Sequence, residues 1–551
     1  MPKKQTFILL AILLISVNLY AQNCTSERYL SNIFQSSVSQ DVVFGNSPAL
    51  TAVYVAENVT VNQEMTMDIF FPVGDNLPKR PLVILAYGGG YLFGTKDDED
   101  VWATCDSLAK KGYVTASINY RMNMNVASGA SAIRAIYRAT QDYSSAIRYL
   151  KEYSNTYGID TNYVFVGGVS AGGFSAMHAV FLDDNERPSE TFQSGLLGGQ
   201  PDLGCVNCAG NPYQHSTSVR GIINLWGALM DTNYIQQNEI VPMALFHGTD
   251  DLIVPYDYGF PFTALFLMPE VFGSENIAAR VNYLGGNAEM NTFPTGHNIW
   301  GVNVGNVLVG GPTEYWNPIT DSIISFLYEN IRPNQAELLV SAPTCESDTV
   351  FIQITNFPTG GRGCWNVELG DIVWSTTDSA TIGVLWTAQG TYDVEAVVFN
   401  HLNAISIPTL IEVELSAFPI VTISNNSGVF EASGNYPSYQ WYLDGQPIQG
   451  ENQSQLIPTS LGEYTVKATN DEGCSALSEP LLAVRVDEQF HSFPNIETIK
   501  VFDAMGRLVN VFGNSREFAN QNWALYQLLF IQYFDAEQNL LGTEKKLTSV
   551  F

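Results

Sequence analysis

The sequence predicts an α/β domain with a mostly parallel sheet, followed by tandem all-β sandwich modules. Up to about residue 332, short apolar runs typical of buried strands alternate with patterns typical of helices. Such alternation indicates a doubly wound sheet that helices cover on both faces. From about residue 335 onward, short alternating strands and turn residues replace the helical patterns. A chain of 551 residues is long enough for several such domains.

The first domain is expected to span residues 22–333. Its strands are predicted where apolar runs are short, at residues 65–71, 81–87, 113–120, 164–166, 219–226 and 242–247. Long helices are predicted at residues 98–111, 131–157 and 319–331, and Gly112 and Gly158 close the first two. The irregular, glycine-rich segment 183–218 is expected to form a cap over a site.

The charge balance limits the classes of partner. Acidic residues outnumber basic ones by 55 to 25, which gives a net charge of −30. Binding to nucleic acid or to an anionic membrane needs clustered Lys and Arg. We therefore expect no nucleic-acid partner, and we interpret the acidity mainly as a source of solubility.

The N-terminus has the outline of a signal peptide at residues 1–21. Lys3 and Lys4 precede an apolar run at residues 7–17, and Ala21 suits a cleavage site. An uncleaved membrane anchor is the alternative, but this apolar run is short for a span. The prediction is an exported protein.

Seven cysteines in an exported chain permit disulfides. We expect Cys24 to pair with Cys105, Cys205 with Cys208, and Cys345 with Cys364, which leaves Cys474 unpaired. The Cys-x-x-Cys spacing at Cys205 and Cys208 is also found in metal and redox sites. No second cysteine pair or histidine cluster completes a zinc site, so a local staple is the interpretation.

The β-rich part of the chain contains an internal repeat. Tyr392 and Tyr464 each follow a Gly-x pair and open an alternating strand. This repeat predicts two β-sandwich modules, at residues 334–415 and 416–487.

One short motif in the first domain can carry nucleophilic chemistry. Gly168, Ser170 and Gly172 form a Gly-x-Ser-x-Gly motif between a predicted strand and a predicted helix. A serine at the apex of such a strained turn is exposed, and its neighbours must be glycines where a Cβ would meet backbone. A simple glycine turn after a buried strand is the alternative.

A serine nucleophile needs a base and an orienting acid, and in enzymes that carry a Gly-x-Ser-x-Gly elbow of this kind the chain order is Ser, then Asp or Glu, then His. Of six histidines, His297 follows the predicted sheet in a loop near the end of the domain. Asp250 and Asp251 directly follow the strand at residues 242–247, and either carboxylate could orient the base. A capping histidine and a solvated turn are the alternatives.

A third element is a glycine loop directly after the buried strand at residues 81–87. The backbone N–H groups of Gly89, Gly90 and Ala171 are candidate oxyanion donors. Among the aromatic residues, Tyr87, Tyr91, Phe174 and Trp226 are candidates for lining a substrate pocket, with a core position as the alternative.

Together these signals resemble the α/β-hydrolase family, specifically secreted carboxylesterase and lipase-like enzymes with a Gly-Gly-x-Ser-Ala-Gly-Gly elbow and a His-Gly-Gly-Gly-type oxyanion loop. Tyr87 replaces the family's histidine. The loop at residues 247–255 is similar to the family's H-G-x-x-D-x-x-V-P loop, and its register assigns the acid to Asp251. The resemblance implies a Ser170–His297–Asp251 triad, an acyl-enzyme intermediate and no metal or cofactor. The implied substrate is a small-molecule, lipid, polyester or polysaccharide ester.

The β modules resemble immunoglobulin-like and PKD-type domains of secreted bacterial proteins. Residues 493–551 resemble the type A C-terminal sorting domain of type IX secretion cargo, with a Val-x-Asp-x-x-Gly-Arg-Leu-Val strand pair from Val501 and a terminal Lys-Lys-Leu. The central motif of that domain appears only loosely, at residues 523–530. A third small β module is the alternative. The resemblance implies secretion or cell-surface attachment, with the outer-membrane secretion machinery as partner.

Two other functions compete with the esterase. A serine peptidase of the prolyl-oligopeptidase type would carry a large β domain, usually before the hydrolase, but only about fifty residues precede the first core strands. A catalytically inactive adhesion protein would show a changed serine, acid or histidine, and all three residues are present.

Overall fold

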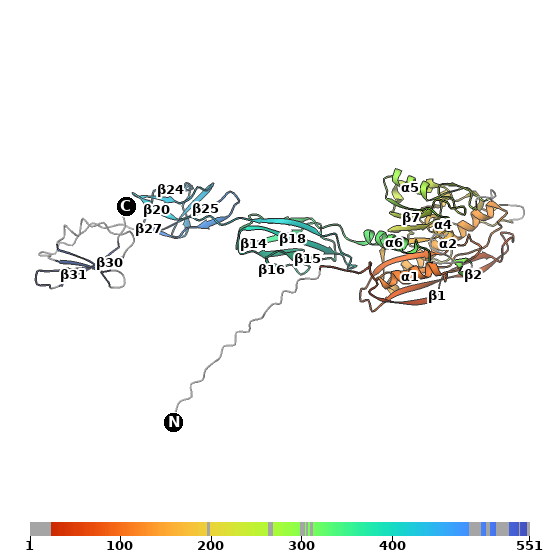
Figure 1. Cartoon of the computed structure of the whole chain (residues 1–551), viewed down its shortest axis with the longest axis horizontal. Coiled ribbons are helices and arrows are strands. Elements are labelled where there is room, and N and C mark those ends of the chain that lie inside the picture. Colours follow the sequence, from red (N-terminus) through yellow and green to blue (C-terminus); the bar gives the residue numbers. More distant parts are fainter. Residues whose placement is uncertain are drawn as a thin grey trace, which may run out of the picture.

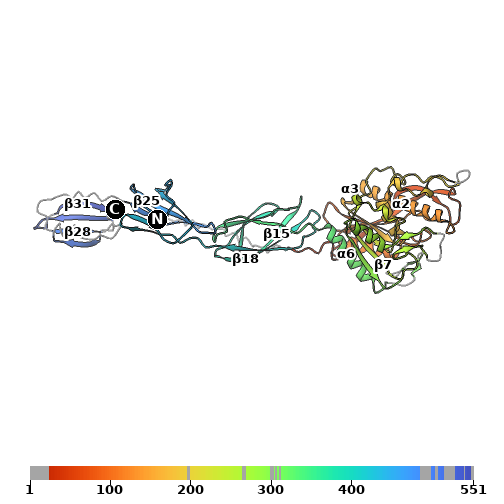
Figure 2. The same cartoon turned by 90° about the horizontal axis from the view of Figure 1, so that it is seen from above.

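The computed structural model describes residues 24–194, 199–262, 268–297, 303–304, 307–308, 312–483, 498–502, 507–513, 528–538 and 540–547. The expected signal peptide and most of the expected motif at residues 523–530 lie outside these residues. The chain is elongated, with a rounded α/β domain at one end and β modules extending from it in a row (Figures 1 and 2).

The expected α/β fold is confirmed. One sheet has the strand order β1-β2-β4-β3-β5-β6-β7-β10. From β4 to β10 every neighbouring pair is parallel, whereas β1, β2 and β4 pair antiparallel. The strands are β1 (Gln35–Leu50), β2 (Thr60–Val73), β3 (Arg80–Ala86), β4 (Val114–Ile118), β5 (Ile159–Val169), β6 (Gly221–Leu225), β7 (Met243–Gly248) and β10 (Ala288–Phe293).

Six α-helices of the described residues accompany this sheet (Figure 1). They are α1 (Glu99–Lys110), α2 (Gly129–Glu152), α3 (Ser154–Tyr157), α4 (Ala171–Phe181), α5 (Ser274–Tyr283) and α6 (Trp316–Ile331). The expected helix at residues 131–157 is interrupted at Tyr153, and Gly158 ends it in the left-handed conformation at φ +64°. No helix among the described residues is long and apolar enough to cross a membrane.

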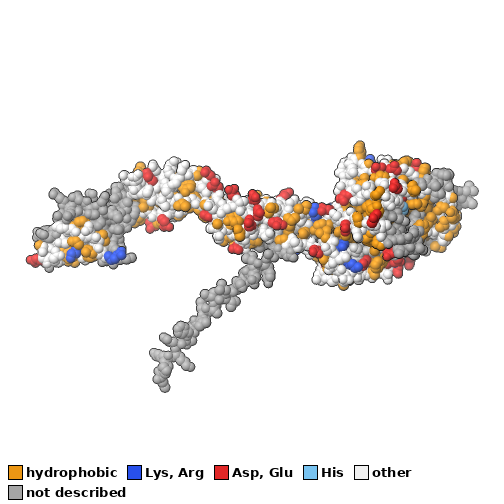
Figure 3. All heavy atoms as spheres, viewed as in Figure 1, with side chains coloured by type: hydrophobic (Ala, Val, Ile, Leu, Met, Phe, Trp, Pro, Cys, Tyr) orange, Lys and Arg blue, Asp and Glu red, His pale blue; other side chains and the backbone are white. Residues whose placement is uncertain are grey.

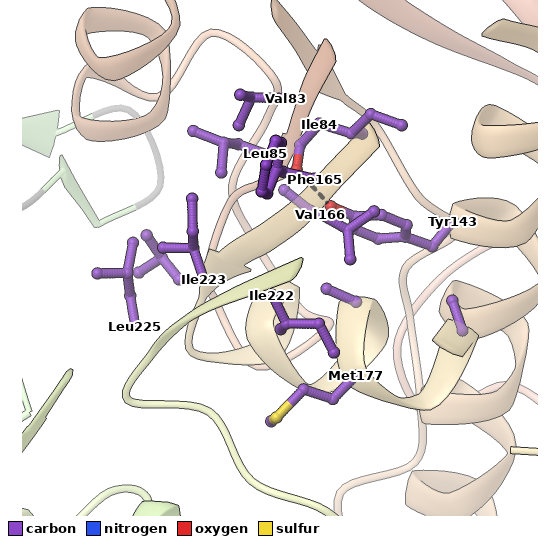
Figure 4. Close-up of a cluster of buried hydrophobic side chains, with 14 of the residues drawn as sticks. Val83, Ile84, Leu85, Tyr143, Phe165, Val166, Met177, Ile222, Ile223 and Leu225 are labelled. Carbon is purple, nitrogen blue, oxygen red and sulfur yellow. Dashed lines mark hydrogen bonds between the residues drawn. The ribbon is translucent and has the colours of Figure 1, made fainter. Parts of the chain in front are cut away.

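A buried tyrosine connects helix α2 to the centre of the sheet (Figure 4). The Tyr143 hydroxyl donates to the carbonyl oxygens of Ile84 and Gly167, at 2.6 and 2.7 Å, and accepts from the N–H of Gly167 at 3.0 Å. Its ring is fully buried among the apolar side chains of β3, β5 and β6. A buried hydroxyl needs such partners, so this contact fixes α2 against β3 and β5.

Two β-sandwiches follow, as expected. The first has sheets β13-β14-β17-β16 and β15-β18-β19, and the second has sheets β20-β21-β24 and β23-β22-β25-β26 with β27 also on β25. In each, the repeated tyrosine donates its hydroxyl to a carbonyl four residues upstream, Tyr392 to Ala388 and Tyr464 to Ser460. The strands are β13 (Leu338–Val340), β14 (Thr349–Ile354), β15 (Arg362–Val367), β16 (Asp371–Ser375), β17 (Thr381–Leu385), β18 (Gly390–Phe399), β19 (Thr409–Leu415), β20 (Ile423–Asn426), β21 (Val429–Ala432), β22 (Ser438–Leu443), β23 (Gln446–Pro447), β24 (Gln455–Leu456), β25 (Gly462–Thr469), β26 (Ser475–Leu477) and β27 (Leu481–Ala483).

The C-terminal region forms a separate four-stranded sheet of order β29-β28-β30-β31. All of its strand pairs are antiparallel. The strands are β28 (Thr498–Phe502), β29 (Leu508–Phe512), β30 (Leu528–Phe534) and β31 (Leu540–Leu547).

The first β-sandwich is docked onto the α/β domain through the loop after β18. Leu402 and Ala404 of this loop are fully buried in the core of the α/β domain. Asn400 donates its side-chain N–H to the Ile331 carbonyl at 2.6 Å, and His401 Nε2 lies 2.7 Å from Asp160. The α/β domain therefore completes its core with residues of the module that follows it.

The disulfides differ from two of the three expected pairs. Cys205 bonds to Cys208 as expected, but Cys24 bonds to Cys364 and Cys345 bonds to Cys474. Cys105 is free and buried in α1, and burial raises the pKa of its thiol. The expectation failed because the N-terminal segment runs beside the first β module, 340 residues away in sequence.

Removing the Cys24–Cys364 disulfide should destabilise the α/β domain together with the first β-sandwich docked on it. The bond closes a loop of 340 residues, so replacing both cysteines by serine should lower the free energy of unfolding by ~2–4 kcal/mol in urea titrations. The matched double replacement of Cys205 and Cys208 opens a loop of only 3 residues and should cost less. Equal losses in both variants would contradict a stabilising role for the long-range bond.

Candidate active site

Ser170 stands at a strained turn between β5 and α4. Its backbone has φ +51° and ψ −117°, a conformation that residues with a Cβ rarely adopt. The turn is held because the N–H of Ser170 donates to the Leu225 carbonyl at 2.8 Å and the Ser170 carbonyl accepts from Phe174 N–H at 3.0 Å. The serine therefore lies at the carboxyl end of the sheet, at the N-terminus of α4.

The glycines around Ser170 allow backbone segments to approach closely. A Cβ at Gly172 would lie 2.2 Å from the Ala86 carbonyl oxygen, and one at Gly168 would lie 2.5 Å from the Gly172 carbonyl carbon. Neither contact is tolerated in a folded protein. The glycines of the motif are therefore needed for steric reasons, because the backbones of β3, the turn and α4 lie too close together to leave room for a Cβ.

The structure brings Ser170, His297 and Asp251 together in a hydrogen-bonded chain. His297 Nε2 lies 2.9 Å from Ser170 Oγ, and His297 Nδ1 lies 2.7 Å from Asp251 Oδ2. Asp251 is 6% exposed, whereas its neighbour Asp250 is exposed to solvent. The geometry thus selects Asp251 from the two adjacent carboxylates.

The Asp251 carboxylate is surrounded by donors. Its Oδ1 accepts from the N–H groups of Ile253 and Val254, at 2.8 and 3.0 Å, while Oδ2 faces His297 and, at 3.3 Å, His247 Nε2. Burial by itself would raise the pKa of Asp251, but the hydrogen bonds from His247 and His297 and the charge of His297 hold that pKa well below its usual value. The carboxylate is therefore ionised when it faces the imidazole.

A buried polar chain that the sequence did not reveal supports Asp251 from behind. The Asn224 side-chain N–H donates to Ser274 Oγ at 3.1 Å, and Ser274 Oγ lies 2.7 Å from His247 Nδ1. Because His247 Nε2 faces two acceptors, Asp251 Oδ2 and the Val254 carbonyl oxygen, this nitrogen carries the proton. Ser274 then donates to Nδ1. The only sequence signal for this series of hydrogen bonds was His247, which precedes Asp251 by four positions.

The glycine loop after β3 lies beside Ser170. Gly89 and Gly90 have φ values of +110° and +60°, and a Cβ at Gly88 would lie 3.3 Å from the Ser170 Cβ. The N–H groups of Gly89, Gly90 and Ala171 donate to no other group among the described residues. These three amides are therefore available to an oxygen atom bound next to Ser170.

Tyr87 supports this loop from inside the domain. Its ring is buried and stacks on Tyr120 with centroids 4.4 Å apart, and the Tyr120 hydroxyl donates to the carbonyl oxygens of Tyr87 and Gly88, both at 3.1 Å. Tyr87, a candidate for lining a substrate pocket, is not among the described residues that line the cavity at Ser170. The same holds for Trp226, which is fully buried and packs edge-on against the His297 ring at 6.3 Å.

An apolar cavity opens at Ser170. It encloses about 490 Å³, part of it open to solvent. Tyr91 and Phe174 line it, as expected, and the Tyr91 hydroxyl turns away to donate to the Ala171 carbonyl at 3.1 Å. The other lining residues are Gly90, Met124, Ala132, Ile136, Ala171, Ile253, Val254, Pro261, Phe262, Met268, Pro269 and Val271.

The described parts of the expected cap, residues 183–194 and 199–218, do not line this cavity. Arg134 and Gln141 of α2 donate to carbonyl groups of that segment, including Pro201 and Leu203, so it packs on α2 instead. Residues from two neighbouring segments line the cavity in its place: Ile253, Val254, Pro261, Phe262, Met268, Pro269 and Val271. Their sequence, rich in proline and aromatic residues, gives no periodic signal, so only the tertiary structure locates them.

His178 lies behind the cavity wall. It is fully buried, its ring stacks parallel to that of Phe174, and its Nδ1 donates to the Phe174 carbonyl at 2.8 Å. Its Nε2 accepts from the Met230 N–H at 3.3 Å. Burial lowers the pKa of His178 to about 4, against the opposing effect of the hydrogen bond with Phe174. The neutral imidazole is therefore part of the fold at neutral pH.

Among the residues that the structure describes, no group of three or more His, Cys, Asp or Glu side chains is arranged to hold a metal ion.

Comparison with known proteins relates this domain to esterases. The BD-FAE family model matches residues 67–230, a range that contains the glycine loop and Ser170 but neither Asp251 nor His297. A probable isoprenylcysteine alpha-carbonyl methylesterase of Arabidopsis thaliana is 25% identical over 254 residues, 41% of this chain and 46% of that protein. An esterase of Caenorhabditis elegans is 28% identical over 122 residues, 20% of this chain and 21% of that protein. The chain thus spans less than half the length of either relative.

Among solved structures, esterase 2 of Thermogutta terrifontis phosphorylated by paraoxon is similar, with 19% identity, a TM-score of 0.33, and coverage of 52% of this chain and 94% of that chain. The same enzyme phosphonylated by cyclosarin gives 18% identity, a TM-score of 0.35, and coverage of 55% and 97%. The sequence matches support an enzyme of the esterase-like hydrolase class.

Acid should destabilise the α/β domain through His178. The pKa of His178 is about 4 in the folded state and 6.5 in the reference state, so as the pH falls the unfolded chain takes up the proton first. The contribution of His178 to the free energy of unfolding is fully present above about pH 6.5. It is lost as the pH falls towards 4, a decrease of ~3 kcal/mol. Urea titrations at several pH values would measure this loss. His178→Gln should flatten the profile, whereas His215→Gln, at an exposed histidine, should retain it.

Proposed function

We propose that the chain is a secreted serine carboxylic-ester hydrolase that works through a Ser170–His297–Asp251 triad and an acyl-enzyme intermediate. The observation that carries the proposal is the hydrogen-bonded chain of these three side chains, of which Ser170 lines an apolar cavity. The matches to esterases support the reaction class. Export rests on the signal peptide and sorting domain expected from the sequence.

In the first half of the reaction, His297 Nε2 removes the proton from Ser170 Oγ as the oxygen attacks the ester carbonyl. The ionised Asp251 holds the imidazole with Nδ1 protonated and stabilises the imidazolium that forms. The carbonyl oxygen becomes an oxyanion within reach of the Gly89, Gly90 and Ala171 amides. Each such donor can lower the barrier by ~3 kcal/mol.

Collapse of this intermediate expels the alcohol, which takes the proton from His297, and leaves the acyl group on Ser170. Water then attacks the acyl-enzyme, with His297 again acting as the base, and releases the acid. The apolar cavity suits the acyl group, because its lining offers Met, Ile, Phe and Val side chains and few polar ones. The proposal covers small-molecule, lipid, polyester and polysaccharide esters as natural substrates.

Ser170→Ala should abolish ester hydrolysis. We expect kcat for p-nitrophenyl butyrate to fall at least about 10³-fold, because the nucleophile is lost. In the wild type, kcat/KM should rise up to roughly fifteenfold from acetate to butyrate, since each of the two added methylenes is worth ~0.8 kcal/mol when buried. The assay should use residues 24–551, because Leu402, Ala404 and Cys364 complete the α/β domain. Folded wild type that cleaves no ester would overturn the proposal, and peptide substrates would be tested next.

The two adjacent aspartates provide a matched pair. Asp251→Asn removes the charge that orients His297 and should lower kcat by ~10³–10⁴-fold. Asp250→Asn changes an exposed carboxylate that contacts neither His297 nor Ser170 and should stay within about twofold of wild type. Steady-state kinetics of both variants on p-nitrophenyl butyrate would decide, and the opposite ranking would show that the acid is misassigned.

A further inference from the structure

The first β-sandwich exposes two aromatic rings on the outer face of one sheet. Phe351 of β14 is 43% exposed and Trp374 of β16 is 49% exposed. Their ring centroids are 5.7 Å apart in an edge-to-face arrangement. The inner face of the same sheet buries Val350, Ile352 and Val384 in the sandwich core, so neither exposed ring belongs to that core.

A glycine between the two strands shapes this face. Gly383 of β17 is the partner of Phe351 on one side and of Trp374 on the other. A Cβ at Gly383 would lie 3.1 Å from Cε1 of Phe351. The Phe351 ring therefore lies down over the glycine instead of standing away from the sheet, and the row Phe351–Gly383–Trp374 forms a low aromatic platform.

Hydrogen-bonding side chains flank the platform. Thr349 and Gln353 are exposed on the same face of β14, two positions on either side of Phe351. Ser341 lies beside Phe351 and accepts from its N–H at 2.9 Å through Oγ. The alternation of side chains along β14 gives Thr349 and Gln353 the same outward direction as the Phe351 ring.

Charge and size limit the partner. Residues 334–415 contain ten Asp and Glu but only one Arg, a net charge of −9, which disfavours anionic polymers and anionic membranes. The two rings together expose on the order of 200 Å². A stable protein interface needs roughly 800 Å² on each side, so the two rings by themselves offer too little area to hold a second protein. One or two sugar rings match its dimensions.

We propose that this platform binds a neutral polysaccharide. The C–H faces of pyranose rings are apolar and pack on aromatic rings, while their hydroxyls find the flanking Thr, Gln and Ser side chains. The module is docked rigidly onto the α/β domain by Asn400, the buried Leu402 and the Cys24–Cys364 bond. A polymer held on the platform therefore stays with the domain that carries Ser170.

The test measures binding of residues 24–551 to insoluble neutral polysaccharides, namely microcrystalline cellulose, arabinoxylan and β-1,3-glucan, with polygalacturonate as the anionic comparison. Wild type should bind at least one neutral polymer, and Trp374→Ala together with Phe351→Ala should weaken that binding at least tenfold. Leu410→Ala is the matched control, because Leu410 is 62% exposed on the other sheet of the same sandwich. It should bind as wild type does.

Three further readouts make the outcome decisive. Circular dichroism should show that the double variant is folded, and p-nitrophenyl butyrate hydrolysis should be unchanged, so failure of the platform and failure of the esterase are separable. Absence of wild-type binding to all three neutral polymers, or equal binding by wild type and double variant, would overturn the proposal. Loss of a wild-type dimer in the double variant, seen by sedimentation, would assign the platform to self-association and overturn it as well.

Discussion

The site depends on one strained backbone position, Ser170. Its positive φ costs ~1–3 kcal/mol, and the surrounding structure has to supply this energy. It does so by packing backbone against backbone, with Ala86 of β3 pressed on Gly172 and with Ser170 bonded to Leu225 of β6. These contacts exist only because β3, β5 and β6 are neighbours in the parallel sheet. The core residues of these strands, shown with Tyr143 in Figure 4, therefore serve the site as well as stability.

The second constraint is the placement of a buried negative charge. Asp251 is desolvated, which is unfavourable unless donors surround it. Two backbone amides and two histidines fulfil this need, and one of these, His247, receives its own orientation from Ser274 and Asn224. The acid is thus fixed by β6, β7 and the start of α5 together. Such multiple support lets a carboxylate hold His297 in one orientation.

The α/β domain and the first β module are joined by more than the chain segment that connects them. The loop after β18 contributes Leu402 and Ala404 to the core of the α/β domain, and Cys24 bonds to Cys364 of the first sandwich. The surface view in Figure 3 shows acidic side chains distributed over the modules and the α/β domain alike. The first sandwich is therefore a structural part of the unit that carries the site.

Residue pattern by itself determined the α/β and β-sandwich classes and predicted the turn at Ser170, because strand periodicity and glycine-flanked turns are local properties of the chain. The prediction of His297 as the base came from the expected chain order. Residue pattern also narrowed the acid to two neighbours. The likeness of the loop at residues 247–255 to the family's loop pointed to Asp251, and in the structure Asp251 is buried beside His297 whereas Asp250 is exposed. Only the tertiary structure placed Ile253, Phe262 and Met268 at the cavity, and only the tertiary structure paired Cys24 with Cys364. These outcomes depend on contacts between segments distant in sequence, and no local pattern encodes which segments meet.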